Sequence, residues 1–255
     1  MNHAEPTPPA AIILAAGKGT RMKSDLPKVL HEVAGKPMVW WVVQACKEAG
    51  ADLCVVVVGY KGELVREALA GEDGIAFVEQ TEQLGTAHAT RMAEPVFEGR
   101  PVSDIFVLAG DGPLIRGKTL ARLLEVHRRT GAASTLATSV IEDPTGYGRI
   151  VRTADGSFNA IVEQKDATPE QLGIREVNPS YYCFRGDALF KTLDQVGSAN
   201  SQGEYYITDA PGLLKQQGQT VTVVDAVPPE DVLSINTLEQ LAEVDKILQD
   251  RLATA

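Results

Sequence analysis

AIILAAGKGTRMKSDLPK, residues 11–28, joins an apolar run to a segment rich in glycine and positive charge. Residues 11–16 have the length and composition of a strand that is buried on both faces of a parallel sheet. Gly17 and Gly19 follow at once, with Arg21 and Lys28 close behind. Glycine lets backbone N–H groups approach phosphate oxygens, and Lys and Arg supply the opposite charge. The stretch therefore predicts a phosphate site at the end of a central strand.

Two common phosphate loops do not match this stretch. A dinucleotide fingerprint requires a small residue where Met22 stands, and the Gly-x4-Gly-Lys-Ser/Thr pattern of a P-loop is absent. An ordinary strand-to-helix connection with a solvated basic surface would have a similar composition. Charge contrast favours a ligand, because the whole chain has a net charge of −10 whereas residues 18–36 hold five basic and two acidic residues. This local excess favours a small anion over nucleic acid or an anionic membrane.

The composition is that of a globular protein with a large core. The chain has 255 residues, of which 44% are hydrophobic. Residues 1–10 are polar and Pro-rich, so we expect a disordered tail followed by one domain over 11–255. No apolar run approaches the ~20 residues of a membrane span, and the tail is unlike a signal peptide, so we expect a cytoplasmic protein. The three cysteines, Cys46, Cys54 and Cys183, lack metal-like spacing and are expected to be buried thiols.

Strand and helix patterns alternate along most of the chain. This alternation predicts a mostly parallel sheet with right-handed crossovers and ligands at the carboxyl ends of its strands. The Asp-Gly pair at 155–156 predicts a hairpin that forms a small antiparallel lobe facing the first. Strands are expected at 11–16, 53–59, 75–78, 104–110, 133–140, 175–184 and 220–226, and helices at 38–49, 63–70, 86–93, 117–130, 187–195, 205–217 and 237–252.

Asp111 directly follows one of the predicted strands and precedes Gly112 and Pro113. One carboxylate can hold Mg²⁺ in a phosphoryl-transfer site, since phosphate oxygens and water complete the coordination. The local sequence alone slightly favours an Asp that fixes a turn or caps a helix. The four histidines lie beside no recognisable Ser or Cys motif, so the sequence offers no nucleophile with a positioned base.

Six ordered stretches carry a resemblance to a known family. LAAGKGTRM followed by SDLPKVLHEVAGKPM resembles the N-terminal signature of the sugar-1-phosphate nucleotidyltransferases, and most closely the uridylyltransferase domain of the bacterial N-acetylglucosamine-1-phosphate uridylyltransferases. The other five are EQTEQLGTAHA at 79–89, AGDGPL at 109–114, DPTGYGRI at 143–150, IVEQKDAT at 161–168 and QGEYYITD at 202–209. The resemblance implies an α/β, Rossmann-like (GT-A-like) nucleotidyltransferase fold, with a mostly parallel mixed sheet, flanking helices and a small antiparallel sugar-binding lobe.

The resemblance also implies an activity. It is the transfer of the uridylyl group of UTP to N-acetylglucosamine 1-phosphate with Mg²⁺, a step toward cell-wall precursors that gives UDP-N-acetylglucosamine and pyrophosphate. A nucleotidyltransferase for another hexose 1-phosphate and a non-catalytic nucleotide-sugar-binding or regulatory protein are the alternatives. Because the chain has no hexapeptide repeats, we expect no acetyltransferase chemistry. The oligomeric state stays open.

Roles for single residues follow from the same resemblance. Arg21 and Lys28 would be catalytic, and Asp111 with Asn236 would bind Mg²⁺. A binder would not need these four residues together, which argues against the non-catalytic alternative. The positions implied to hold the nucleotide are Leu14, Ala15, Ala16, Gly17, Gly19, Lys28, Gln80, Gly85, Thr86 and Gly110. The positions implied to hold the sugar are Gly148, Glu163, Asn178, Tyr206 and Thr208. Without the resemblance, the local sequence around each of these residues is equally typical of a turn, a helix cap or a strand.

The chain departs from the family pattern at three places. Ala109 and Gly112 stand where Tyr and a branched residue are usual, and Ala87 stands where Gly is usual. Pro179-Ser180 replaces the usual Thr-Gly, and Pro179 fixes φ and removes an N–H beside the predicted sugar pocket. The Pro179-Ser180 change lies beside the predicted sugar pocket and leaves the predicted nucleotide half unchanged. We therefore expect the family's preference for uridine to be kept more surely than its preference for N-acetylglucosamine.

Overall fold

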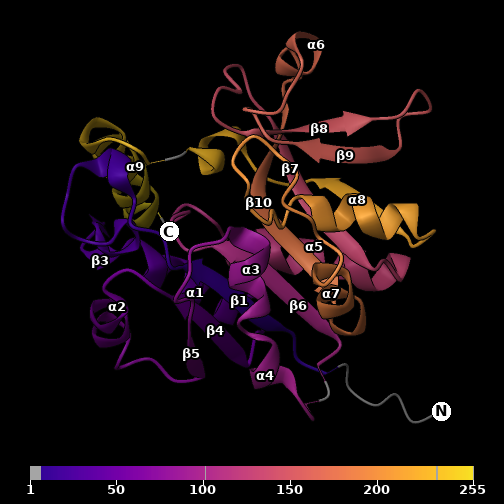
Figure 1. Ribbon diagram of the computed structural model, residues 1–255. Coiled ribbons are helices and arrows are strands. Elements are labelled where there is room, and N and C mark those ends of the chain that lie inside the picture. Colours follow the sequence, from indigo (N-terminus) through magenta and orange to yellow (C-terminus); the bar gives the residue numbers. More distant parts are fainter. Residues whose placement is uncertain (1–6, 101, 234, 255) are drawn as a thin grey trace.

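The computed structural model describes residues 7–100, 102–233 and 235–254. These residues form a nine-stranded mixed sheet whose main path runs β11-β7-β10-β6-β1-β4-β5 (Figure 1). Its strands are β1 (Ala10–Ala15), β4 (Leu53–Val58), β5 (Ile75–Glu79), β6 (Asp104–Ala109), β7 (Ser134–Val140), β8 (Gly148–Arg152), β9 (Phe158–Val162), β10 (Glu176–Arg185) and β11 (Val221–Asp225). A separate hairpin consists of β2 (Glu32–Val33) and β3 (Lys36–Pro37).

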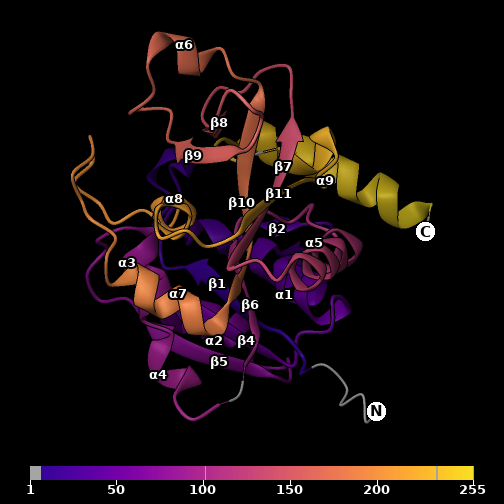
Figure 2. The same cartoon turned by 90° about the vertical axis from the view of Figure 1, so that its right-hand side faces the viewer.

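Helices cover both faces of the sheet. In Figure 2, α1 and α5 lie on one side of the central strands and α3, α7 and α8 lie on the other. The helices are α1 (Met38–Glu48), α2 (Gly62–Ala68), α3 (Thr86–Arg91), α4 (Glu94–Phe97), α5 (Gly117–Thr130), α6 (Pro169–Leu172), α7 (Gly186–Leu193), α8 (Asp209–Gln216) and α9 (Leu238–Ala253). Short 3-10 turns span Thr20–Met22, Lys28–Leu30 and Pro229–Val232.

β1 is the strand from which the site is built. It runs parallel to β4 on one side and to β6 on the other. Its side chains alternate between two cores: Ala11, Ile13 and Ala15 pack with α1 and α5, whereas Ala10 and Ile12 pack with α3, α7 and α8. Burial of both faces explains why the sequence shows a continuous apolar run here instead of an alternation.

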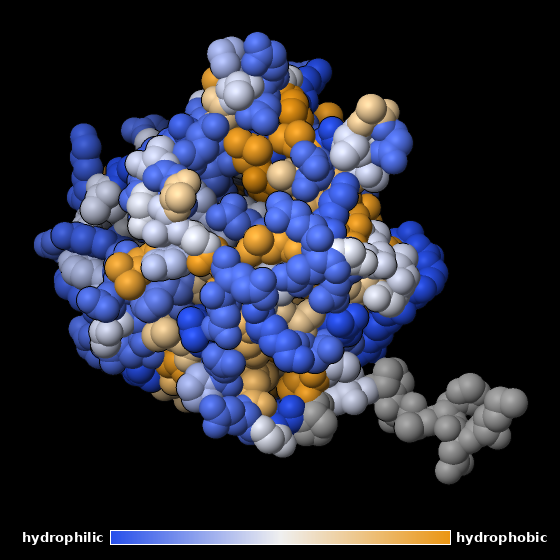
Figure 3. Space-filling model, turned by 45° about the vertical axis from the view of Figure 1, so that its right-hand side comes forward, coloured by the Kyte–Doolittle hydropathy of each residue, from blue (hydrophilic) through white to orange (hydrophobic). Residues whose placement is uncertain are grey.

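The small lobe predicted around the Asp-Gly turn is present. β8 and β9 pair antiparallel, and β8 joins the main sheet where Gly148 and Arg149 pair with Asn178 and Val177 of β10. This lobe, with α6 at its tip, stands at the top of Figure 1. Polar residues cover most of the face in Figure 3, and apolar residues gather mainly in the upper lobe. β10 is antiparallel to both β6 and β7, so the sheet is mixed, as expected.

The C-terminal helix α9 packs across the β2–β3 hairpin. Val244 and Leu248 of α9 share a small core with Val33 and Met38. Arg251 Nη1 donates a 2.9 Å hydrogen bond to the carbonyl of Leu114, which ties the end of α9 to the loop after β6. Leu233 and Asn236, which precede α9, lie near the carboxyl end of β6, because they line one cavity with Ala109 and Asp111.

Two predicted boundaries are wrong. The predicted tail extended to residue 10, but Pro9 accepts a 3.2 Å hydrogen bond from Asp52 N–H and Ala10 begins β1; residues 1–6 of that prediction lie outside the described residues. The predicted helix over 205–217 begins only at Asp209, because residues 205–207 pair with the loop before α3.

Two further expectations concern burial and membranes. All three cysteines are buried and unpaired, as predicted. In the part of the chain that the structure describes, no helix is both long and apolar enough to cross a membrane.

Candidate active site

The loop after β1 passes close to Lys28, the first residue of the second 3-10 turn. Gly19 has φ +68° and ends this loop, and a Cβ at this position would lie 2.4 Å from Cβ of Lys28. A side chain at residue 19 would therefore clash with Lys28 as well as strain the backbone. Gly19 therefore allows the loop and Lys28 to come together at the carboxyl end of β1.

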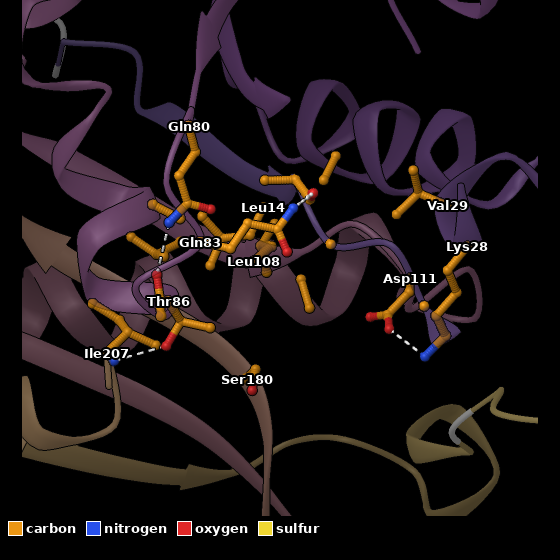
Figure 4. Close-up of a pocket in the computed structure, with 18 of the residues that line it drawn as sticks. Leu14, Lys28, Val29, Gln80, Gln83, Thr86, Leu108, Asp111, Ser180 and Ile207 are labelled. Atoms are coloured by element: carbon orange, nitrogen blue, oxygen red, sulfur yellow. Dashed lines mark hydrogen bonds and ion pairs between the residues drawn. The ribbon is translucent and has the colours of Figure 1, made fainter. Parts of the chain in front are cut away.

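A cavity of about 370 Å³ opens at this end of the sheet (Figure 4). Every residue predicted to hold the nucleotide lines it except Gly110. Gly110 instead donates its N–H to the carbonyl of Leu14 at 2.9 Å, so it supports the wall formed by the end of β1. The catalytic candidates Arg21 and Lys28 line the same cavity, which we call the nucleotide cavity.

Two glutamines shape one side of the nucleotide cavity. Gln80 is buried, and its Nε2 lies 3.1 Å from the carbonyl of Gly85 and 2.9 Å from His88 Nδ1. Its carbonyl oxygen is therefore the group it can offer to an N–H of a ligand. Gln83 Nε2 donates a 2.8 Å hydrogen bond to the carbonyl of Ala16 and so ties this loop to the end of β1.

The residues just before α8 complete the same wall. Tyr205 donates its N–H to the carbonyl of Leu84 and accepts from the N–H of Ala87, and Ile207 N–H donates to Thr86 Oγ1 at 2.9 Å. Gly85 has φ +112°, and a Cβ on it would meet the Tyr205 carbonyl oxygen at 2.5 Å. This pairing explains why residues 205–207 lie outside α8 in spite of their helical pattern, and it joins the 79–89 and 202–209 motifs.

A second cavity of about 280 Å³, the sugar cavity, adjoins the first beneath the small lobe. Gly148, Glu163 and Asn178, which the resemblance implied to hold the sugar, line this cavity. Tyr206 and Thr208 are not among the residues that line it. Thr208 is buried, and its hydroxyl lowers the pKa of Glu163. The structure thus brings three of the five predicted sugar residues together.

Glu163 lies in an environment that disfavours its charge. Burial raises the pKa of its carboxyl group, the hydroxyl of Thr208 partly opposes this rise, and Asp166 and Asp209 add to it. Arg149, which is almost fully buried, lowers the pKa slightly. A carboxylate oxygen accepts hydrogen bonds, which suits recognition of hydroxyl and amide N–H groups.

Lys28 and Asp111 form an ion pair at the boundary between the cavities. Lys28 Nζ lies 2.6 Å from Asp111 Oδ2, and the two side chains are 13% and 33% exposed. Asn236 lines the sugar cavity together with Asp111. Carboxylate and amide oxygens are hard donors that suit Mg²⁺. Within the described ranges no group of three His, Cys, Asp or Glu residues could hold a metal ion, so an ion here would depend on Asp111, Asn236 and oxygens of substrate or water.

The border between the two cavities has a distinctive composition. The residues that line both are Arg21, Lys28, Ala109, Asp111 and Ser180. Two cations, a carboxylate and a hydroxyl therefore surround the passage that a phosphate group would occupy if ligands filled both cavities. In Figure 4, Ser180 lies across the cavity from Leu108, between Thr86 and Asp111.

Ion pairs hold the 3-10 turn Pro229–Val232, which precedes Asn236 in the sequence. Asp231 is 2% exposed and accepts hydrogen bonds from Arg116 Nε and Arg251 Nη2, each at 2.5 Å. Arg251 also binds the carbonyl of Leu114, three residues beyond Asp111. The network thus holds Leu114, three residues after Asp111, and Asp231, five residues before Asn236, and the sequence analysis did not identify it.

Sequence reasoning also missed residues that line the nucleotide cavity. Gln83, Tyr182 and Glu204 all line it. Gln83 and Glu204 lie inside the 79–89 and 202–209 motifs, so their position in a motif was an available signal. Tyr182 is buried in β10, and its sequence context does not distinguish it from a core residue.

The structure gives a reason for part of the departures from the family pattern. A Cβ on Gly112 would meet Tyr181 Oη at 2.9 Å, so the small residue makes room for this buried tyrosine. Ala87 is buried in α3, and Ala109 borders both cavities. Nothing in the structure explains why Ala109 replaces the usual tyrosine.

A glycine loop at the carboxyl end of a central parallel strand is typical of a site for a phosphate-bearing ligand such as a nucleotide, and here a second cavity and a cationic border adjoin it. Residues 11–203 match the model of the MobA-like NTP transferase domain, and the chain belongs to that family.

Curated relatives agree with this assignment. The chain is 47% identical over 243 residues to the bifunctional protein GlmU of Geobacter metallireducens, covering 95% of this chain and 51% of that protein. It is 49% identical over 242 residues to the bifunctional protein GlmU of Heliobacterium modesticaldum, covering 95% and 52%. The chain thus spans about half the length of the curated relatives it matches.

Solved structures support the fold. The structure of a UDP-glucose pyrophosphorylase complexed with UDP-glucose matches with a TM-score of 0.76 at 18% identity, covering 96% of this chain and 100% of that one. An apo UDP-glucose pyrophosphorylase matches with a TM-score of 0.74 at 17% identity. The fold is therefore the mixed α/β nucleotidyltransferase fold that the resemblance implied.

Proposed function

We propose that the protein transfers the uridylyl group of UTP to N-acetylglucosamine 1-phosphate, forming UDP-N-acetylglucosamine and pyrophosphate. The observation that carries the proposal is the border of two cations and one carboxylate shared by two adjoining cavities. Identities of 47% and 49% to GlmU proteins over 95% of the chain support it, and the sequence motifs supply the choice of substrates. No observation favours another hexose 1-phosphate or a non-catalytic role.

The reaction needs alignment more than a protein nucleophile. An oxygen of the sugar 1-phosphate attacks the α-phosphorus of UTP, a new P–O bond forms, and the bond from the α-phosphorus to the bridging oxygen breaks. Its electron pair leaves with pyrophosphate. Because the attacking oxygen is already an anion, no residue must remove a proton, and the protein contributes position and opposite charge.

The border residues are suited to that contribution. Arg21 and Lys28 stabilise the triphosphate and the departing pyrophosphate. Asp111 and the Asn236 amide oxygen would hold Mg²⁺, which supplies further neutralisation of phosphate charge when bound. Arg21 is exposed, whereas Lys28 is paired with Asp111, so a phosphate would bind Lys28 by taking the place of Asp111.

The nucleotide cavity would then recognise UTP, and the sugar cavity would recognise the sugar 1-phosphate. Gln80 and the Gly85–Thr86 backbone would pair with the edge of uracil, and all three residues line the nucleotide cavity. Glu163 and Asn178 offer a carboxyl and an amide to the sugar hydroxyls and acetamido group. A pocket shaped for an acetamido group leaves polar groups unpaired when glucose 1-phosphate binds, so discrimination of roughly 10- to 200-fold is expected.

The test is pyrophosphate release from UTP and Mg²⁺ with a panel of sugar 1-phosphates: N-acetylglucosamine, N-acetylgalactosamine, glucosamine and glucose. The proposal predicts the highest kcat/KM for N-acetylglucosamine 1-phosphate. An equal or higher kcat/KM for an unacetylated sugar 1-phosphate would refute the sugar assignment and leave the nucleotidyl transfer in place. If no sugar 1-phosphate gave pyrophosphate release, the proposed enzyme activity itself would be refuted. The expected absence of acetyltransferase activity and the cytoplasmic location stay predictions.

A further inference from the structure

Ser180 stands at the border of the two cavities in an unusual backbone conformation. It has φ +64°, in the left-handed region that favours glycine. The described residues include three other non-glycine residues with positive φ, namely Lys23, Ala34 and Lys61, and none of them lines the nucleotide or the sugar cavity. A strained residue that persists at a candidate site points to a role for its side chain.

The surrounding contacts hold Ser180 in this conformation. β10 shifts register against β7 between Val177 and Tyr181. Asn178 Oδ1 accepts a 3.2 Å hydrogen bond from Ser180 N–H, and Asn178 Nδ2 donates to Tyr182 Oη at 2.6 Å. Both Asn178 and Tyr182 are buried, so the turn rests on a rigid base. A glycine would adopt the same turn without the steric cost of a Cβ.

The hydroxyl of Ser180 also differs chemically from the other groups at the border. Arg21 and Lys28 are cations, Asp111 is an acceptor, and Ala109 is apolar. Among these five described residues, Ser180 alone supplies a neutral donor. It approaches from β10, across the cavity from the β1 loop that supplies the cations. A phosphate bound between the cavities would therefore meet cations on one side and this hydroxyl on the other. The Ser180 hydroxyl also interacts with Tyr182, and a serine hydroxyl can accept one hydrogen bond while it donates another.

We propose that Ser180 Oγ donates a hydrogen bond to a phosphate oxygen where the sugar 1-phosphate meets the α-phosphate of UTP, and so helps to align the two groups. This inference rests on the proposed function, because that function places the two phosphates at the border. A hydrogen bond to a charged oxygen is stronger than one between neutral groups, which makes the strained serine worth retaining.

Two variants separate the hydroxyl from the backbone. Ser180→Ala removes the hydroxyl and keeps the Cβ, whereas Ser180→Gly removes the hydroxyl and relieves the backbone. We expect both to lower kcat/KM for the sugar 1-phosphate by about 10-fold or more. We expect both to weaken the binding of UDP-N-acetylglucosamine, measured by calorimetry, by a similar factor. Ser180→Gly should raise Tm by about 2–4 °C, and Ser180→Ala should not.

Ala34→Gly is the matched control, because Ala34 has φ +49° and lies outside both cavities. It should raise Tm in the same way and leave kcat/KM and product affinity unchanged. The inference is refuted if Ser180→Ala keeps kcat/KM and product affinity within twofold of wild type, whatever Ser180→Gly does. An inactive wild-type protein would refute the proposed function itself, so the two failures are distinguishable.

Discussion

Lys28 Nζ lies 2.6 Å from Asp111 Oδ2, so the strongest candidate for a pyrophosphate-binding cation is paired with the strongest candidate for a metal ligand. The pair joins the loop after β1 to the loop after β6, because Lys28 follows the first and Asp111 the second. It also lies on the border of both cavities. A phosphate that binds Lys28 would take the place of the Asp111 carboxylate, which is also negative. A metal cation that binds Asp111 would take the place of the Lys28 ammonium group, which is also positive.

Lys28→Ala and Arg21→Ala should each lower kcat at least a hundredfold with little effect on folding. Removal of one transition-state contact of this kind costs on the order of 3 kcal/mol, and neither side chain is part of the core. Steady-state kinetics together with thermal unfolding measures both effects. Lys61→Ala is the control, since Lys61 lies outside both cavities and binds the carbonyl of Asp25. Near-wild-type rates for both cavity variants would remove the phosphate role from these residues.

Asp111→Asn should raise the Mg²⁺ concentration needed for half-maximal activity, because the amide keeps the shape of the side chain and loses its charge. Lys28→Ala should lower the rate without raising that requirement, since it removes the other half of the pair. Titration of activity with Mg²⁺ in both variants separates the two roles. If Asp111→Asn is fully active at low Mg²⁺, Asp111 does not bind the metal ion and only stabilises the turn after β6.

Asp231→Ala should lower the free energy of unfolding by about 3 kcal/mol or more, because it leaves the guanidinium groups of Arg116 and Arg251 without their buried partner. Urea denaturation measures the change. Glu230→Gln is the control, since Glu230 is exposed and makes a 3.2 Å contact with the same Arg116. It should cost less than about 1 kcal/mol. An equal, small effect of both variants would contradict the network described around Asp231.

Glu72 should make the stability of the protein depend on pH. Hydrogen bonds from Lys47, Gln44 and Trp40 lower the pKa of Glu72 to about 2, below its value of about 4.5 in the unfolded chain. The charged carboxylate therefore stabilises the fold above about pH 4.5, and this contribution is lost as the pH falls toward 2. Glu72→Gln should cost about 1 kcal/mol at pH 7 and much less at pH 2.5, measured by urea denaturation. A difference that did not shrink with acid would exclude the proposed role of Glu72.

The sequence predicted the fold where local pattern and burial agree. The apolar runs at 11–16 and 53–59 became β1 and β4, which are buried on both faces, and the Asp-Gly turn became the β8–β9 hairpin. The predicted helix start at 205 failed because Tyr205 pairs with the loop around Gly85, a contact between residues far apart in the sequence. Such pairings leave no periodic signal in a single segment.

The site was predicted to a similar degree. Residues in strand-end motifs, such as Gly19 and Gln80, line the nucleotide cavity because β1 and its parallel neighbours end at one edge of the sheet. Tyr206 and Thr208 do not line the sugar cavity, since the turn before α8 directs the backbone at 205–207 toward the nucleotide side. The conformation of Ser180 could not be predicted, because it depends on the register shift of β10 against β7.

The most direct test of the central claim follows the α-phosphorus of UTP. The purified protein is incubated with Mg²⁺, N-acetylglucosamine 1-phosphate and UTP that carries ³²P at the α position, and the products are separated by chromatography. The account predicts that the label passes into UDP-N-acetylglucosamine, with release of one unlabelled pyrophosphate for each labelled product. Label that stays in UTP, or that appears in UMP or UDP instead of the nucleotide sugar, would contradict it.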